Sequence, residues 1–150
     1  MQKVSKVIVV AGILCSLFFV KADAVNNRSD SKKDQQTVRY TGDADLLYQQ
    51  IDFGDEKPVD RDVFEKAYRG YLNLQAAGKI AAGKDILSVC DFGLSSNQKR
   101  LWVIDLKAKK LLYHSLVAHG QGTGQEFASR FSNRDGSHQS SLGFYITEDT

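Results

Sequence analysis

The sequence predicts an α+β domain: a helical preamble over residues 44–80, followed by a mainly antiparallel β-sheet over residues 81–150. Apolar residues recur with a helical period between Val63 and Leu74. Short apolar and β-branched runs then alternate with polar or glycine-containing turns, which is typical of successive strands. The predicted strands cover residues 86–92, 101–106, 111–117 and 142–147. A chain of this length has room for one small hydrophobic core.

The first 24 residues are expected to be a cleaved secretory signal peptide that takes no part in the fold. Lys3 and Lys6 precede an uncharged apolar run from Val7 to Val20, and Ala22-Asp23-Ala24 supplies the small residues of a cleavage site. The run is short for a membrane span, which favours a cleaved signal; an uncleaved N-terminal anchor is the alternative. After cleavage no stable membrane span is expected, and the protein would be exported.

Loss of this segment changes both the charge and the cysteine content. The whole chain has a formal net charge of +2, but three Lys and only one Asp leave with residues 1–24, so the remainder is about neutral. Nucleic-acid binding, which needs a basic face, is not expected. Cys15 follows Leu14 where a lipoprotein would need a small residue, so no lipid anchor is expected. Cys90 then remains alone, and no internal disulfide is possible.

Residues 25–43 are polar and predict a flexible linker, because they cannot bury enough apolar area to offset their ordering entropy. Within the preamble, Asp60 is a predicted helix N-cap, with acidic residues in the following turn. Gly78 is placed to end this helix. Gly70 lies inside it and weakens the prediction, because glycine costs about 1 kcal/mol relative to alanine in a helix.

Cysteine, histidine and glycine residues suggest several chemistries, each with a structural alternative. Cys90 with His114 or His119 would form a thiolate–imidazole pair, whereas a free cysteine inside an apolar strand is more often a buried packing residue. Three scattered histidines make a poor metal site. The glycine-rich segment 120–124 lacks the Lys-Ser/Thr pair and the helix start of a phosphate-binding loop, so a turn needing positive φ is favoured.

Several motifs in order resemble one enzyme family over about residues 64–147. They are Phe64-Glu65-Lys66-Ala67, Gly70-Tyr71, Ser88 to Ser96, Lys99 to Leu106, Val117-Ala118-His119-Gly120, Phe131-Ser132-Asn133, Gly136-Ser137, and Ser140-Ser141-Leu142-Gly143-Phe144-Tyr145. Together they resemble the N-terminal part of the bacterial murein L,D-transpeptidase catalytic-domain family (YkuD-like). The resemblance implies the front half of that family's β fold, in the periplasm or cell envelope of a bacterium.

Enzymes of this family cross-link peptidoglycan stem peptides through a cysteine thioester, with a histidine that activates the thiol and backbone N–H groups that stabilise the oxyanion. Their histidine and Ser-x-Gly-Cys segment follow the strand that corresponds to Leu142–Tyr145, but this chain ends at Thr150. His119-Gly120 precedes that strand, so no catalytic residue is carried over. We expect a truncated, inactive form; the alternatives are a secreted, non-catalytic peptidoglycan-binding module and a cysteine hydrolase using Cys90 and His119.

The expected partner is a peptidoglycan stem peptide, and neither a cofactor nor a metal is expected. The resemblance gives no prediction of the oligomeric state. Residues of the loops between Gly120 and Ser141 and of the strand after them are candidates for lining a substrate groove, although such loops are as often plain connections. The candidate groove residues are His119, Gly120, Ser140, Ser141, Gly143 and Tyr145.

Overall fold

The computed structural model describes residues 7–11 and 42–147. Its elements are, in chain order, β1 (Val7–Ala11), a helix over residues 42–50, α2 (Arg61–Ala76), β2 (Ile86–Asp91), β3 (Leu101–Asp105), β4 (Lys110–Ser115) and β5 (Gly143–Ile146). The α+β class is confirmed, and each predicted strand is present; β2, β3 and β5 are slightly shorter than predicted, and β4 begins one residue earlier and ends two residues earlier. The first helix begins two residues before the expected boundary at residue 44. Residues 25–41 of the expected linker lie outside the described residues.

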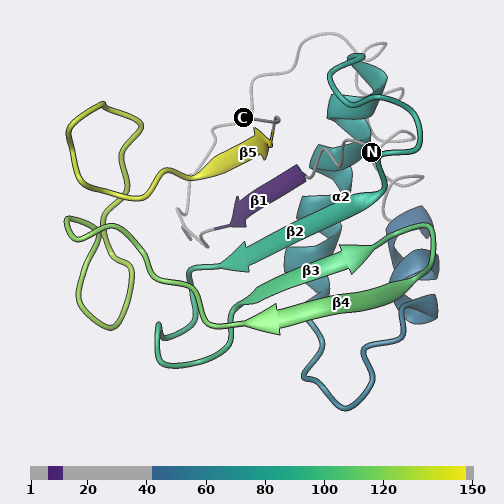
Figure 1. Cartoon of the computed structure of the whole chain (residues 1–150), viewed down its shortest axis with the longest axis horizontal. Helices are drawn as coiled ribbons and strands as arrows, with labels where there is room; N and C mark the ends of the chain where they lie inside the picture. The colour runs from purple at the N-terminus through teal and green to yellow at the C-terminus, as the bar shows by residue number, and fades with distance from the viewer. Residues whose placement is uncertain (1–6, 12–41, 148–150) are drawn as a thin grey trace, which may run out of the picture.

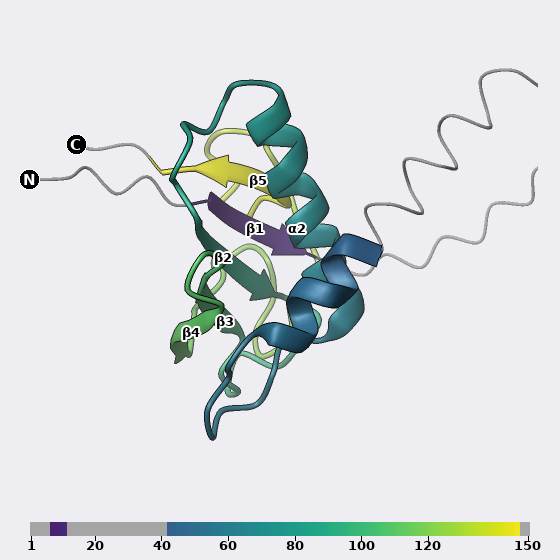
Figure 2. The same cartoon turned by 90° about the vertical axis from the view of Figure 1, so that its right-hand side faces the viewer.

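The strands form one sheet in the order β4-β3-β2-β1-β5 (Figure 1). The pairs β4–β3, β3–β2 and β1–β5 are antiparallel, so the predicted mainly antiparallel sheet is confirmed. The one parallel pair joins β1 to β2. Both helices lie on one side of the sheet (Figure 2). The domain therefore has two layers, helices against a sheet.

The position of β1 differs from the expectation that residues 1–24 take no part in the fold. Val7–Ala11 lies between β2 and β5 and pairs with both strands along most of its length. The sequence VIVVA explains how both interpretations arise, since β-branched residues favour an extended strand and also make an apolar signal segment. In the whole chain, part of the predicted leader is thus a strand of the sheet.

Helix α2 follows the sequence prediction closely. Asp60 is its N-cap, and one carboxylate oxygen accepts hydrogen bonds from the backbone N–H groups of Asp62 and Val63 at 3.0 and 3.2 Å. Gly78 follows the end of the helix with φ of 66°, a conformation that glycine adopts without a Cβ penalty. Local capping chemistry therefore sets both ends of α2.

The buried side of α2 and the strands β2 and β3 make the hydrophobic core. Residues that are fully buried here include Val63, Phe64, Ala67, Leu87, Val89, Trp102 and Ile104. On β3 the burial alternates, because successive side chains of a strand point to opposite faces. Burying one large apolar side chain contributes about 1.5–3 kcal/mol, so this cluster is the main source of stability.

Gly70 is buried in the middle of α2 because the ring of Phe144 from β5 lies directly against it. A Cβ atom added at Gly70 would lie 1.8 Å from Cε1 of Phe144. The glycine that weakens the helix in the sequence thus allows β5 to approach α2 closely. This contact joins residues more than seventy positions apart, which local propensity does not reveal.

In the full chain, we expect Gly70→Ala and Phe144→Ala to be strongly coupled. Alone, Gly70→Ala must displace the Phe144 ring, which offsets or reverses its helix-propensity gain of about 1 kcal/mol. In the Phe144→Ala background that gain should be recovered, giving a coupling energy of about 1–2 kcal/mol. Urea unfolding of the four proteins measures it, and additive effects would show that the ring does not lie against α2.

Candidate functional site

The loops that carry most of the candidate groove residues gather at one end of the sheet. In an antiparallel arrangement, the ends of β2 and β4 meet the beginnings of β3 and β5 (Figure 1). The segments that follow β2 and β4 and those that precede β3 and β5 therefore come together. We call this region the loop cluster and define it as residues 92–100, 117–124 and 137–142.

The side chain of Arg100, which comes immediately before β3, is completely buried and holds the loop cluster together. Its guanidinium group donates hydrogen bonds to the carbonyl oxygen of Leu94 at 2.7 Å and to that of Val117 at 3.1 and 3.2 Å. The guanidinium carbon also lies 5.0 Å from the centre of the Phe92 ring, a cation–π contact. Backbone carbonyl dipoles and an aromatic ring therefore solvate this buried charge in place of water.

His119 is engaged by the same arginine. Its Nδ1 lies 2.8 Å from Nη2 of Arg100, and its Nε2 lies 3.2 Å from the carbonyl oxygen of Gly124. Arginine only donates hydrogen bonds, so Nδ1 must accept, and a carbonyl only accepts, so Nε2 must donate. The contacts therefore define a neutral ring with its proton on Nε2. Both ring nitrogens are occupied by structural hydrogen bonds.

Two of the loops are joined by hydrogen bonds around the buried Thr123. The hydroxyl oxygen of Thr123 accepts from the backbone N–H of Ser140 at 2.7 Å, and the hydroxyl oxygen of Ser140 accepts from the N–H of Gly120 at 2.8 Å. The N–H of Gly122 donates to the carbonyl of His138 at 2.7 Å. The two segments therefore form one ordered unit.

The expected reason for the glycines in this loop is corrected for Gly120 and Gly122. Neither has positive φ. Instead, a Cβ atom at Gly120 would lie 2.5 Å from the carbonyl oxygen of His138, and one at Gly122 would lie 2.9 Å from that of Ser137. These glycines permit the two loop backbones to approach each other, which is a different requirement from turn geometry.

The six candidate groove residues are only partly brought together. His119, Gly120, Ser140 and Ser141 lie in the loop cluster, where the hydroxyl of Ser141 donates to the carbonyl of Ser132 at 2.9 Å. Gly143 and Tyr145 belong to β5. Neither Arg100 nor Thr123 was among the candidate residues predicted from the sequence. An arginine directly before an apolar strand was the available signal for Arg100, whereas nothing in the sequence marks Thr123.

Cys90 lies on β2 and is buried. Burial raises the pKa of its thiol to about 12; the positive charge of Arg100 opposes this rise and the carboxylate of Asp91 adds to it. A nucleophilic cysteine needs a low thiol pKa and access to solvent. The environment of Cys90 is the opposite, which favours the packing interpretation over the thiolate–imidazole pair.

Cys90 in the folded Cys15→Ser protein should react with iodoacetamide on the order of 1,000-fold more slowly at pH 7 than in the urea-unfolded chain. The reason is that a pKa near 12 leaves little thiolate, and burial adds a barrier to access. Mass spectrometry of alkylated peptides measures both rates. Comparable rates in the folded and unfolded states would restore Cys90 as a candidate nucleophile.

His114, on β4, belongs to a second contact network on the sheet. Its ring stacks on the indole of Trp102 with centroids 4.7 Å apart, and Nδ1 lies 2.8 Å from a carboxylate oxygen of Glu56. The other carboxylate oxygen of Glu56 accepts from Lys99 at 2.6 Å. Lys99 and, to a smaller extent, His114 lower the pKa of Glu56. The network fastens the segment before α2 to β3 and β4.

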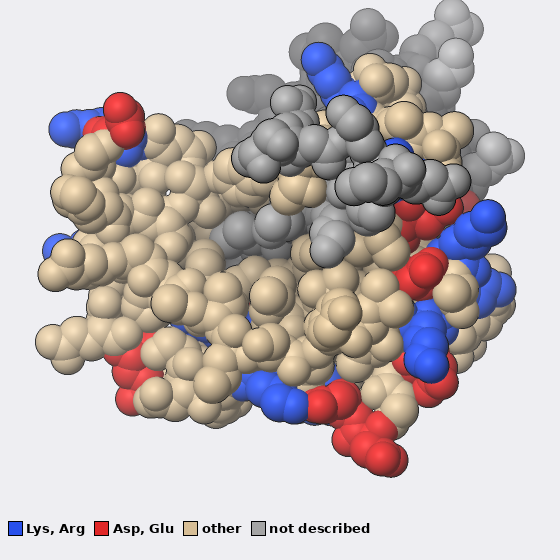
Figure 3. Space-filling model, in the orientation of Figure 1, with Lys and Arg blue, Asp and Glu red and all other residues tan. Residues whose placement is uncertain are grey.

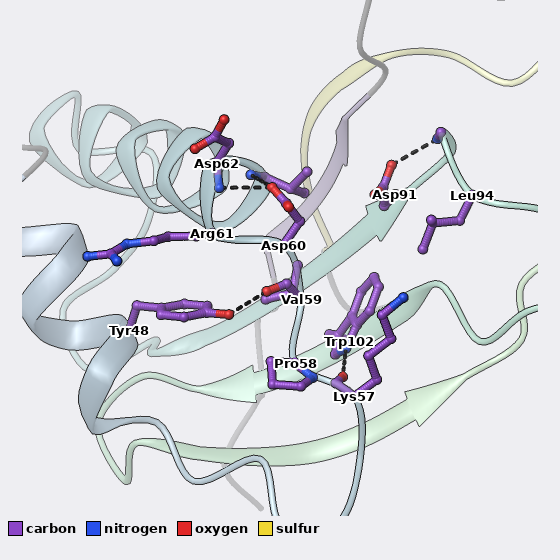
Figure 4. A pocket seen from close by; sticks show the side chains of 12 residues that line it. Tyr48, Lys57, Pro58, Val59, Asp60, Arg61, Asp62, Asp91, Leu94 and Trp102 are labelled. Atoms are coloured by element: carbon purple, nitrogen blue, oxygen red, sulfur yellow. Dashed lines mark hydrogen bonds between the residues drawn. The ribbon is translucent and has the colours of Figure 1, made fainter.

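A cleft of about 600 Å³ lies between the start of α2, the segment before it, the end of β2 and the beginning of β3 (Figure 4). Its walls include Tyr48, Asp60, Leu94 and the buried Trp102, whose indole N–H donates to the carbonyl of Lys57 at 2.9 Å. None of the six candidate groove residues lines this cleft. The predicted groove and the cleft are therefore different regions of the molecule.

Where it is visible in Figure 3, the face of the sheet turned away from the helices is largely uncharged, and basic and acidic side chains lie next to each other along its lower margin. Among residues 7–11 and 42–147, no three histidine, cysteine or acidic side chains are grouped as metal ligands. Within the same part of the chain, no helix is long and apolar enough to cross a membrane.

The fold and the loop cluster define a small α+β domain in which a mainly antiparallel sheet is backed by helices and presents connected loops at one end. The family model for the L,D-transpeptidase catalytic domain matches residues 55–150, and the chain belongs to this family. The resemblance found in the sequence motifs is thereby confirmed. Comparisons with curated proteins and with solved structures gave no match.

We expect Arg100→Ala to destabilise the fold by about 2–4 kcal/mol, because it removes a fully buried side chain and leaves partly buried carbonyl oxygens of the loop cluster without their donors. Arg100→Lys should recover only part of this loss, since an ammonium group cannot reproduce the planar fork. Urea unfolding measures both variants, with the exposed Arg134→Ala as the control. Equal stability of Arg100→Ala and Arg134→Ala would contradict this role.

Proposed function

We propose that the chain is an exported part of an L,D-transpeptidase domain that meets peptidoglycan stem peptides in the bacterial cell envelope, and that residues 1–150 do not by themselves catalyse acyl transfer. The family match over residues 55–150 is the observation that carries this proposal. In it, residues 1–24 are a signal peptide, residues 25–43 a linker, residues 44–80 the preamble and residues 81–150 a partial catalytic domain.

The proposed lack of catalysis rests on the thiols and histidines of the chain. Acyl transfer through a thioester needs an accessible thiolate with a base beside it. The chain contains two cysteines, of which Cys15 lies in the proposed signal peptide and Cys90 is buried with a raised thiol pKa. Both ring nitrogens of His119 are engaged by Arg100 and Gly124. The family's catalytic cysteine and histidine are proposed to lie outside residues 1–150.

A non-catalytic peptidoglycan-binding module is the second candidate, and the order within the loop cluster favours it. Hydrogen bonds among Gly120, Thr123 and Ser140 hold two loops in one arrangement. A preorganised surface loses less conformational entropy when it binds a ligand. Exposed parts of Tyr145 and of the neighbouring loops would then contact the stem peptide.

One experiment on purified protein tests both candidates. The protein is incubated with sacculi rich in tetrapeptide stems, and released D-alanine and retained protein are measured together. We expect no D-alanine above the protein-free control, and D-alanine release that depends on the protein would contradict the proposal. Saturable retention that falls several-fold in Tyr145→Ala, but not in the matched control Tyr113→Ala, is expected for the binding module.

A further inference from the structure

Among the strand pairings of the described residues, β1 is the only neighbour of β5 in the sheet. The sheet order places β1 between β2 and β5, and β5 has no direct pairing with β2. The proposed signal peptide contains β1. Its removal would therefore leave β5 without a partner and would expose the edge of β2, the most buried of the strands β2 to β5.

The direction and register of β5 fit a direct pairing with β2. Because β1 is parallel to β2 and antiparallel to β5, strands β2 and β5 run antiparallel to each other. Each β1 residue from Val7 to Val10 lies between one residue of β2 and one residue of β5. The β2 and β5 residues that flank the same β1 residue are Leu87 and Ile146, Ser88 and Tyr145, Val89 and Phe144, and Cys90 and Gly143.

In matching rows, the side chains of β2 and β5 also point to the same side of the sheet. Leu87 and Val89 are fully buried in the core, and the residues in the same rows of β5, Ile146 and Phe144, face the core and Gly70 of α2. Moving β5 sideways by one strand position, about 4.8 Å, would keep every side chain on its present face.

Gly143 lies where such a movement needs a pivot. Ser140 and Ser141 before it are fixed to other loops by hydrogen bonds, and the strand begins at Gly143 itself. Its φ is 146°, in a region that side-chain-bearing residues rarely adopt. A glycine between an anchored loop and a strand can change its dihedral angles with little steric penalty.

We propose that, once the signal peptide has been removed, β5 moves by one strand position and pairs directly with β2. The inference rests on the proposed signal cleavage. The mixed five-stranded sheet becomes a four-stranded antiparallel sheet in the order β4-β3-β2-β5. The backbone groups of β2 and β5 that β1 had bonded then satisfy each other, so neither strand leaves an unpaired edge inside the domain.

Engineered cysteines distinguish the two sheets. In the variant Ser88→Cys/Tyr145→Cys, with Cys15→Ser and Cys90→Ser, the two new thiols are two strand spacings apart while β1 is present. That separation is about 9–10 Å between Cα atoms, beyond the limit of about 7 Å for a disulfide. After direct pairing they would be cross-strand neighbours at about 5 Å.

The variant is prepared in two forms. Cell-free synthesis without membranes gives the unprocessed chain, and extraction from the cell envelope gives the exported chain, whose mass shows whether residues 1–24 are gone. Both are oxidised and analysed by mass spectrometry without reduction. The matched control Ser88→Cys/Val103→Cys, with the same background changes, joins residues that are already paired and should oxidise in both forms.

We expect the 88–145 disulfide in at least ten times higher yield in the processed chain than in the unprocessed one. Equal yields in both forms, or no bond in a processed chain whose 88–103 control oxidises, would overturn the proposal. A bond between two chains would show that a second copy fills the position, and failure of the control would show that no four-stranded sheet forms. Both results also overturn it.

The export proposal fails separately if the envelope protein retains residues 1–24. In that case, residues 25–150 are produced directly and carry the same pair of cysteine variants. Formation of the 88–145 bond in that chain supports the movement of β5 without natural cleavage. Its absence overturns the movement, whatever the fate of the signal peptide.

Discussion

The buried guanidinium group of Arg100 is the constraint on which the loop cluster depends. It is completely buried, and its hydrogen bonds run to backbone carbonyls and to His119 rather than to a carboxylate. A buried charge of this kind is stable only if its donors are satisfied, so the chain after β2 and the chain after β4 must keep fixed positions around it. The orientation of His119 follows from the same requirement, because its Nδ1 is one of the acceptors.

Much of the fold could be predicted from the sequence because its signals are local. The N-cap at Asp60, the glycine after α2 and the alternation of β3 each depend on residues within a few positions. The contact between Gly70 and Phe144 could not be predicted, since it joins distant parts of the chain. The central position of β1 was missed for another reason: an apolar β-branched run satisfies the rules for a signal segment and for a strand equally well.

The candidate site was predicted less completely than the fold. Motif resemblance selected His119, Gly120, Ser140 and Ser141, which lie together in the loop cluster, but it also selected Gly143 and Tyr145 on β5. The contacts that organise the cluster come from Arg100 and Thr123, whose roles depend on burial and on carbonyl positions that no spacing rule encodes. Burial also makes Cys90 a poor nucleophile, because desolvation raises its thiol pKa by more than the nearby positive charge of Arg100 lowers it.

The place of Val7–Ala11 in the sheet has a consequence for the order of events during biosynthesis. A strand with neighbours on both sides has its backbone groups hydrogen-bonded, so it is not free to be recognised as an extended or helical targeting segment. If residues 1–24 are the proposed signal peptide, targeting and folding compete for the same five residues. The competition would be kinetic: β5 follows β1 by more than a hundred residues, so the sheet can close around β1 only after that part of the chain has been made, and the interval before that is the time available for recognition.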